Sequence, residues 1–315
     1  MLTLDARAVA ESLPYEQLID ALDAAFQRDQ VVPERAHYDV RVPRGTTGTL
    51  LTMPAWRPGA SLGVKIATIF PDNSGKGLPP VHATYLLLDA QTGVPRAQLD
   101  GAELTLRRTA AASALASRYL SRVDSRVLLL VGSGSLAPHL ICAHAAVRDV
   151  EEVLIWSRRR ESAQALASRF ADAAWKTVVA DDLQQAVRQA DLISCATLAT
   201  EPLVFGDWLH AGQHLDLVGA FKPGMQEVDT VAMQRADVYV DTYAGAFAEA
   251  GEIVAALQKG AIGRSDIIAD LAGLCQKIEP GRQGEDSITL FKSVGTALED
   301  LTGAELALRN QQTNG

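Results

Sequence analysis

Residues 126–160 read RVLLLVGSGSLAPHLICAHAAVRDVEEVLIWSRRR. The stretch opens with a run rich in Val and Leu that stops at a glycine, as buried parallel strands do. Gly132, Gly134 and Ala137 then fit the pattern G-x-G-x-x-G/A. In that pattern the first glycine makes a tight turn, the second admits a pyrophosphate close to the backbone, and the third small residue lets a helix pack on the strand. A second apolar run, VLIW, completes a predicted βαβ unit that binds a dinucleotide.

The helix after this turn is expected to direct its N-terminal amides at phosphate groups. Ser135 fits an N-cap, and Leu136 begins the apolar face of the helix. Both residues therefore join Gly132 and Gly134 as expected cofactor contacts. The alternative is an ordinary turn whose glycines only shape the backbone. Strand, turn, helix and second strand occur in the required order, which favours the dinucleotide site.

The residues after the second strand predict which dinucleotide binds. An NAD site usually carries Asp or Glu about 20 residues past the glycines, where the carboxylate holds the ribose hydroxyls. This chain has Ser157, Arg158, Arg159 and Arg160 instead. A hydroxyl and guanidinium groups accept a 2′-phosphate, which a carboxylate would repel. We expect NADPH, with NADH as a weaker substitute; the alternative is a solvated basic start of a helix.

The composition is that of a soluble globular protein with two domains. The chain has 315 residues, of which 48% are hydrophobic and 21% charged, and a net charge of −9, which argues against a nucleic-acid partner. We find no apolar run of membrane-spanning length and no signal-peptide pattern, so we expect a cytoplasmic protein without a membrane partner. Three widely spaced cysteines and six histidines without ligand spacing predict no metal.

Strand-like and helix-like segments alternate after residue 160, which predicts a doubly wound parallel sheet of the Rossmann type. Before residue 126 the order differs, because two helices are expected within residues 5–30 and are followed by strand-like segments. These segments are 38–42, 49–53, 62–70 and 81–89. They predict a separate α+β domain for substrate binding and dimerisation. An Ala-rich helix, 101–120, follows them. We expect this domain to span 1–120, with 296–315 returning to it, and the NADP-binding domain to span 121–295.

Three basic residues of the N-terminal domain predict an anionic substrate. Lys65 lies mid-strand among aliphatic residues, where an ammonium group is costly unless it meets a partner such as a ligand carboxylate. Arg108 offers a planar fork near the start of a helix, and Arg35 is a third cation. Taken singly, each could equally be a surface or ion-paired residue. Lys65 and His82 are candidate proton donors, although a lone histidine in a strand is more often structural.

Seven segments together resemble the ornithine cyclodeaminase and mu-crystallin family over nearly the whole chain. They are MPAW (53–56), GVKIATIFPDN (63–73), GLPPVHATYLLLDAQTG (77–93), LTLRRTAAASALASRYL (104–120), ATLATEPLVFGDWL (196–209), DLVGAFKPGMQEVD (216–229) and LFKSVG (290–295). The resemblance implies a homodimer whose N-terminal sheets pair, with the last helix packed on that domain and the substrate between it and the nicotinamide.

The resemblance also implies roles for individual residues. Arg35, Lys65 and Arg108 match the family residues that hold the substrate carboxylate, and His82 matches a histidine of mu-crystallin-like members. The remaining expected contacts are Met53 and Phe221 with the substrate, and Thr109, Thr197, Val218, Gly219 and Ser293 with the cofactor.

One departure from the family pattern predicts the reaction. Ornithine cyclodeaminases carry an aspartate where this chain has Phe221, and a phenyl ring can neither accept a proton nor bind an ammonium group through a carboxylate. The resemblance is therefore to the ketimine reductase branch, which implies reduction of 1-pyrroline-2-carboxylate to proline or of 1-piperideine-2-carboxylate to pipecolate. Two alternatives are reductive amination of a 2-oxo acid, as in alanine dehydrogenases of this family, and NADPH-dependent ligand binding without turnover, as in mu-crystallin.

Overall fold

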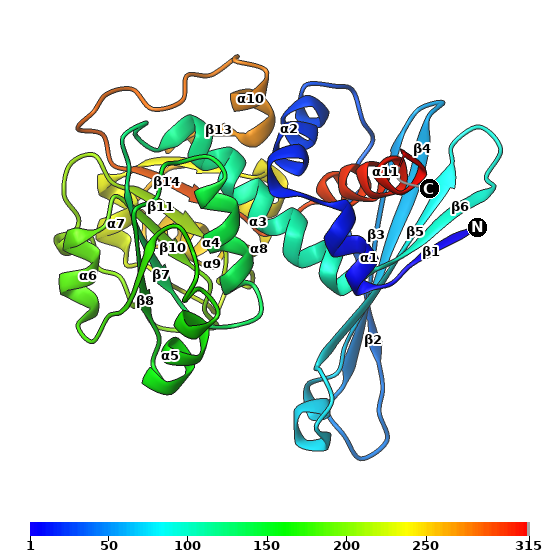
Figure 1. Cartoon of the computed structure of the whole chain (residues 1–315), viewed down its shortest axis with the longest axis horizontal. Helices are drawn as coiled ribbons and strands as arrows, with labels where there is room; N and C mark the ends of the chain where they lie inside the picture. The colour runs from blue at the N-terminus through cyan, green and yellow to red at the C-terminus, as the bar shows by residue number, and fades with distance from the viewer. Residues whose placement is uncertain (314–315) are drawn as a thin grey trace. The chain divides into compact units, whose positions relative to one another are not determined.

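The computed structural model describes residues 1–313 and divides into two compact units (Figure 1). The first unit contains Met1–Thr109 and the C-terminal segment from Thr296, and the second is Ala110–Gly295. Helix α3, Gly101–Leu120, runs through the division and gives its first turns to the first unit. The division therefore lies before the boundary at residue 120 that we expected, because one continuous helix serves both units.

A six-stranded sheet forms the first unit, with the strand order β1-β6-β5-β4-β3-β2. Strand β1 pairs parallel to β6, and the other neighbours are antiparallel. The strands are β1 (Leu2–Leu4), β2 (Ala36–Val40), β3 (Gly48–Arg57), β4 (Ser61–Ile69), β5 (Val81–Asp89) and β6 (Pro95–Asp100). Sequence analysis missed β1 and β6, because one has three residues and the other begins with a proline.

Helices cover one face of this sheet. They are α1 (Ala6–Ser12), α2 (Tyr15–Phe26) and α11 (Ala297–Thr313), and α11 contacts β3, β4, β5 and both other helices. Alternate residues of β4, including Lys65, are buried toward α11, whereas Ile66 on the opposite face is 43% exposed. This opposite face also carries Tyr38, which is 55% exposed.

The second unit is built on an eight-stranded sheet in which every neighbouring pair is parallel. Its strand order is β13-β12-β14-β11-β10-β7-β8-β9, so the direction of winding reverses between β7 and β10. The strands are β7 (Val127–Val131), β8 (Glu152–Trp156), β9 (Lys176–Val179), β10 (Leu192–Cys195), β11 (His214–Leu217), β12 (Asp237–Val240), β13 (Ile267–Asp270) and β14 (Thr289–Lys292). The predicted doubly wound parallel sheet is confirmed. We did not predict β13 or β14.

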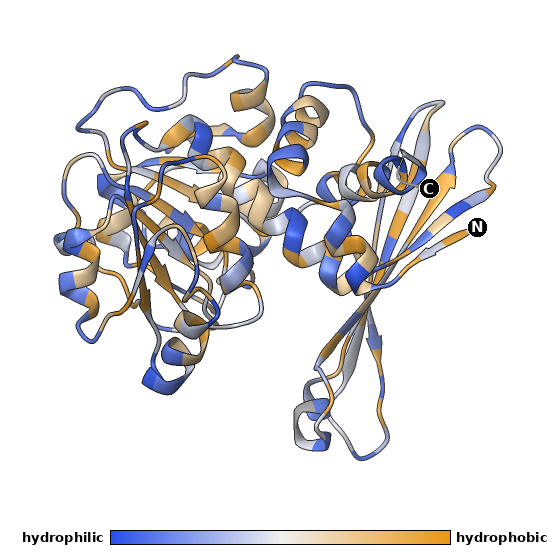
Figure 2. Cartoon of the chain, viewed as in Figure 1, coloured by the Kyte–Doolittle hydropathy of each residue, from blue (hydrophilic) through white to orange (hydrophobic). Residues whose placement is uncertain are grey.

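Helices surround this sheet. They are α4 (Ala137–Ala145), α5 (Arg160–Ser168), α6 (Leu183–Gln189), α7 (Thr230–Arg235), α8 (Tyr243–Glu249), α9 (Gly251–Gln258) and α10 (Leu271–Cys275). The strands are largely hydrophobic, whereas α5 and α6 carry many hydrophilic residues (Figure 2). Among residues 1–313 no helix combines the length and the apolar character needed to cross a bilayer.

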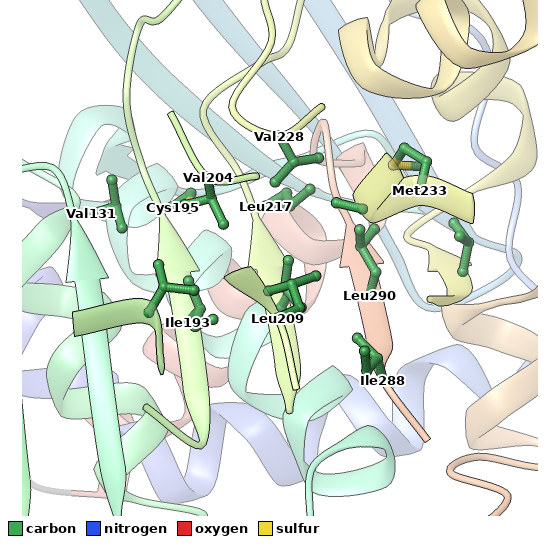
Figure 3. Packing of buried hydrophobic residues seen from close by; sticks show 14 of the residues in the cluster. Val131, Ile193, Cys195, Val204, Leu209, Leu217, Val228, Met233, Ile288 and Leu290 are labelled. Carbon is green, nitrogen blue, oxygen red and sulfur yellow. The ribbon is translucent and has the colours of Figure 1, made fainter. Parts of the chain in front are cut away.

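A hydrophobic core of the second unit lies on the sheet and extends along its central strands to their carboxyl ends (Figure 3). Val131, Cys195 and Leu217 come from three neighbouring strands and are fully buried. Val204 and Val228, from the segments after β10 and β11, pack against them and form a parallel bridge with each other. Burying each such side chain stabilises the fold by about 1.5–3 kcal/mol. This packing fixes the loops at the carboxyl edge, where ligands bind in doubly wound sheets.

Candidate active site

A buried cluster of opposite charges lies between β4, α3 and α11 in the first unit. Lys65 Nζ lies 2.8 Å from Asp300 Oδ2, and Arg108 Nε lies 2.9 Å from Asp300 Oδ1. Arg108 also reaches Glu299, with 2.5 Å between Nη1 and Oε2. Lys65 and Arg108 are each 4% exposed, and both acids are fully buried. Asp300 therefore holds together the two cations that sequence analysis assigned to the substrate carboxylate.

Burial and neighbouring charges shift the pKa values of Lys65 and Asp300 in this cluster. Burial, followed by the charge of Arg108, lowers the pKa of Lys65 to about 8, and the charge of Arg35 acts in the same direction. Burial raises the pKa of Asp300, but Arg108 and Lys65 outweigh burial and hold it below its usual value. Asp300 therefore stays ionised at neutral pH, while Lys65 releases its proton more readily than an exposed lysine does.

Met53 and Lys65 are direct neighbours in the β3–β4 register, and Met53 is 3% exposed. The fully buried Tyr85 lies opposite Lys65 on the other side, in β5. Apolar and aromatic surfaces therefore flank the ammonium group. This setting explains why burial is the largest influence on the pKa of Lys65.

The structure does not bring His82 to this cluster. His82 pairs with Thr68 and lies three residues before Tyr85, which is the partner of Lys65. Because successive side chains of a strand point to opposite faces, His82 and Lys65 lie on opposite faces of the sheet. His82 is exposed, whereas Lys65 is buried. His82 as a proton donor therefore stays a prediction, and it is one that the Lys65 cluster does not support.

The glycine turn after β7 has the conformation of a phosphate-binding turn. Gly132 has φ +121°, and a Cβ there would lie 2.6 Å from the carbonyl oxygen of Ala196, so only glycine fits. At Gly134 a Cβ would meet no atom within 4 Å. The N-cap of α4 is Leu136, without a side-chain cap, so the expectation of Ser135 as N-cap is wrong. Open space at Gly134 and an uncapped helix start fit a pyrophosphate.

The basic residues after β8 differ in their surroundings. Arg158 and Arg159 are exposed, whereas Arg160 forms an ion pair with Asp181. Ser157 Oγ lies 2.9 Å from Ser133 Oγ, which ties the end of β8 to the glycine turn. Because Arg158 and Arg159 are exposed, their guanidinium groups can reach a ligand phosphate. Arg160 would first have to leave Asp181.

The other predicted cofactor residues of this unit follow the central strands. Thr197 follows β10, Val218 and Gly219 follow β11, and Ser293 follows β14. The amide of Val218 donates to Cys195, and that of Ser293 donates to Leu217. Adjacent parallel strands thus bring these residues to one edge of the sheet. Phe221, in the loop after β11, is 38% exposed. Thr109 is the last residue of the first unit before the division.

Sequence analysis missed several buried acids that shape these regions. Glu299 and Asp300 stand together in the apolar stretch TALEDLTGAELAL, which is the signal that could have revealed them. Asp241 Oδ2 accepts hydrogen bonds from the amides of Val294 and Gly295, at 2.8 and 2.7 Å. Asp241 thereby fixes the segment that follows β14.

A family model described as ornithine cyclodeaminase/mu-crystallin family matches residues 1–314. The chain belongs to this family. Delta(1)-pyrroline-2-carboxylate reductase of Colwellia psychrerythraea is 38% identical over 310 residues, which are 96% of this chain and 97% of that protein. The predicted family and its ketimine reductase branch are confirmed.

Two solved structures share the fold over the full length of the chain. Delta(1)-pyrroline-2-carboxylate reductase of Thermococcus litoralis, in complex with NADH and L-proline, has a TM-score of 0.94 and 31% identity and is covered over 98% of its length. An archaeal alanine dehydrogenase dimer with bound NAD has a TM-score of 0.91 and 30% identity, with 97% of its length covered. Both contain a nicotinamide dinucleotide, in agreement with the predicted cofactor class.

Proposed function

We propose that this protein reduces cyclic ketimine carboxylates, converting 1-pyrroline-2-carboxylate to L-proline or 1-piperideine-2-carboxylate to L-pipecolate. The observation that carries the proposal is that Lys65 and Arg108, the two cations expected to hold a substrate carboxylate, lie together in one buried cluster with Glu299 and Asp300. A small carboxylate is the ligand that such a site would take. The named activities of the Colwellia and Thermococcus relatives support this substrate class.

The first role of these residues is to orient the substrate. Arg108 would bind the carboxylate with its planar guanidinium group. Lys65 and Arg35 would add positive charge. Met53, the strand neighbour of Lys65, would offer apolar surface to a ring without a side-chain amine. Holding two reactants in the productive geometry can supply about 7–11 kcal/mol of the barrier reduction.

The second role is to keep a proton on the imine nitrogen, because a protonated iminium accepts hydride more readily. Lys65 is our candidate for this role, since its pKa of about 8 keeps it protonated at neutral pH while making the proton easier to release. A dinucleotide held at the glycine turn would supply the hydride. Hydride at the imine carbon and a proton at the nitrogen together give the cyclic amine.

We assign the dinucleotide to the glycine turn and the edge of the parallel sheet, with NADPH preferred over NADH. Gly132, Gly134 and the start of α4 would bind the pyrophosphate. Arg158 and Arg159 would bind the 2′-phosphate, and this is what favours NADPH. The two solved relatives described above contain NADH and NAD, so the preference of this chain rests on its own arginines.

We further propose a homodimer formed through the open face of the six-stranded sheet. This face carries exposed apolar side chains, including Tyr38 and Ile66, and large exposed apolar patches mark interaction sites. The archaeal alanine dehydrogenase, which has the same fold, is described as a dimer. Measurement of the mass in solution by light scattering, with Ile66→Lys as the test variant, decides this point.

The test of the function is NADPH oxidation, followed by its absorbance, with 1-pyrroline-2-carboxylate and 1-piperideine-2-carboxylate. Turnover of either imine would establish the proposal, and the ratio of the two rates would define the ring preference. Pyruvate with ammonia forms a parallel arm, because the match to alanine dehydrogenase favours reductive amination as the second candidate. Turnover of pyruvate alone, or ammonia release from L-ornithine with NAD, would contradict the proposal.

A further inference from the structure

One carboxylate joins the two loops that follow the central strands β10 and β11. Glu227 Oε1 accepts hydrogen bonds from the amide of Thr197 at 2.7 Å and from its hydroxyl at 2.8 Å. Glu227 Oε2 accepts from the amide of Gly219 at 2.7 Å. The Glu227 side chain is fully buried. Each oxygen of the carboxylate therefore holds the backbone of a different loop.

The two loops are also in direct contact. A Cβ at Gly219 would lie 2.1 Å from the carbonyl oxygen of Thr197 and 2.3 Å from Glu227 Oε1. The amides of Leu203 and Val204 donate to the carbonyl oxygen of Glu227, at 2.9 and 3.0 Å. The side chain and the backbone of Glu227 thus bind the segment after β10 from two directions.

The strand order indicates which half of the dinucleotide these loops would meet. The glycine turn follows β7, and Ser157 and the arginines follow β8, so the adenosine half belongs over β7 and β8. A dinucleotide crosses the sheet at the point where the strand order reverses, which here is between β7 and β10. The loops at Thr197 and Gly219 would therefore border the nicotinamide half. This step rests on the cofactor assignment made under the proposed function.

Glu227 belongs to a buried group that holds two carboxylates and one ammonium. Lys292 Nζ lies 3.2 Å from Glu252 Oε2 with both side chains fully buried, and Glu252 Oε1 accepts from the amide of Glu227 at 2.8 Å. Burial raises the pKa of Glu227 to about 7, the charge of Lys292 opposes this rise, and Glu252 adds to it. Burying such charge is unfavourable. A glutamine could not replace the carboxylate, because its amide nitrogen only donates and would face a donating N–H of one of the two loops.

We propose that Glu227 is a positioning residue for the nicotinamide half of the cofactor, acting through the backbone of Thr197 and Gly219. The carboxylate sets the spacing of the two loops, and the loops form the surface on which the nicotinamide rests. Glu227 itself contacts neither cofactor nor substrate.

Two pairs of ligands test this role. NADPH is compared with 2′-phospho-ADP-ribose, and NADH with ADP-ribose, because each fragment lacks only the nicotinamide. Dissociation constants are measured by calorimetry for the wild type and Glu227→Gln. We expect the variant to bind the whole dinucleotide at least about tenfold more weakly, which is the loss of one charge-assisted hydrogen bond. The fragments should keep their affinity within about twofold.

Asp216→Asn is the matched control. Asp216 is another buried carboxylate of this unit, and it accepts from Ser194 Oγ at 2.6 Å and pairs with His144 at 3.2 Å. It bonds neither Thr197 nor Gly219 in the described contacts, so its loss should lower stability without changing the ratio of dinucleotide to fragment affinity. Glu227→Asp serves as a second test variant if the glutamine variant does not fold, because it keeps the charge but shortens the reach to both amides.

An equal loss of affinity for dinucleotide and fragment, or no loss for either, would overturn the positioning role. The binding experiment requires neither turnover nor a known preference between NADPH and NADH. The ratio of dinucleotide affinity to fragment affinity is taken for whichever of the two ligand pairs the wild type binds more tightly. Imine turnover by the wild type is measured separately. Failure of the proposed function and failure of this inference therefore give different results.

Discussion

Lys65 and Asp300 form a buried ion pair with 2.8 Å between Nζ and Oδ2, although 235 residues separate them in the chain. The pair joins a central strand of the antiparallel sheet to the C-terminal helix, and the same carboxylate also binds Arg108. A substrate site on this cluster would therefore be assembled only when the end of the chain packs onto the sheet. The ion pair makes the C-terminal helix part of the proposed site.

Asp300→Asn should lower the free energy of unfolding by about 3–5 kcal/mol, because it leaves two buried cations without their shared partner. Urea unfolding followed by circular dichroism measures the change. Glu305→Gln is the control, since the Arg57–Glu305 pair is partly exposed and its loss should lower stability by less than about 1 kcal/mol. If both substitutions lower the free energy of unfolding equally, the buried Asp300 cluster stabilises the fold no more than a partly exposed ion pair does.

Substrate affinity should fall as the pH rises through about 8, where Lys65 loses its proton and its attraction for a carboxylate. KM for the imine and inhibition by pyrrole-2-carboxylate, measured between about pH 6 and 10, should both show this dependence. Lys65→Arg should shift the loss to higher pH, since a guanidinium stays charged. A flat profile for the inhibitor would exclude Lys65 from the carboxylate site.

The lowered pKa of Lys65 also makes the stability of the fold depend on pH. Stability should rise with pH, whereas substrate affinity should fall. The pKa of Lys65 is depressed from 10.5 to about 8 in the folded protein, mainly by burial. The stability linked to this group is therefore fully present above pH 10.5 and is lost as the pH falls through about 8. Comparison of urea midpoints of wild type and Lys65→Met across this window should show a pH-dependent difference. A constant difference would contradict the depressed pKa.

Arg108→Ala should raise KM for the imine carboxylate by about 10–100-fold, which corresponds to the loss of a charge-assisted hydrogen bond, and should leave the dissociation constant for NADPH unchanged. Arg107→Ala is a control from the same helix. Arg107 pairs with Glu103 and donates to the carbonyl oxygen of Leu13, so its loss should affect stability and spare KM. If both variants raise KM alike, Arg108 has no specific role.

Replacing Arg158 and Arg159 together by Ala should weaken NADPH binding by about tenfold or more and alter NADH binding by less than about threefold, because only NADPH carries the 2′-phosphate. Arg160→Ala is the matched control, since Arg160 is already engaged with Asp181. Fluorescence titration gives both dissociation constants. An equal loss for the two dinucleotides would remove the argument for NADPH.

Gly134→Ala should leave the unfolding midpoint unchanged but weaken dinucleotide binding at least about tenfold, because the added methyl meets no protein atom and would enter the space proposed for the pyrophosphate. Gly132→Ala should instead destabilise the fold, since φ is +121° and the methyl would meet the Ala196 carbonyl. Unchanged cofactor affinity in Gly134→Ala would place the pyrophosphate elsewhere.

Local sequence patterns determined the parallel sheet, the glycine turn, and helix α3 with the bounds that we predicted. These features depend on periodicity and on turn chemistry, which neighbouring residues specify by themselves. The N-cap expected at Ser135 was wrong, because the helix begins at Ala137 and Leu136 is its N-cap. Short strands such as β1 and β14 carry too few residues for a pattern, and their pairing with distant strands stabilises them.

The sequence by itself also identified Lys65 and Arg108 as unusual, because a cation among apolar residues requires a partner. It could not name Asp300 as that partner, nor Glu227 as the link between two loops. Those contacts join residues far apart in the chain, and only the tertiary structure brings them together. The tertiary structure likewise decided the position of His82. Whether two residues of neighbouring strands lie on the same face of a sheet depends on the strand register, and whether they are buried depends on which face the helices cover.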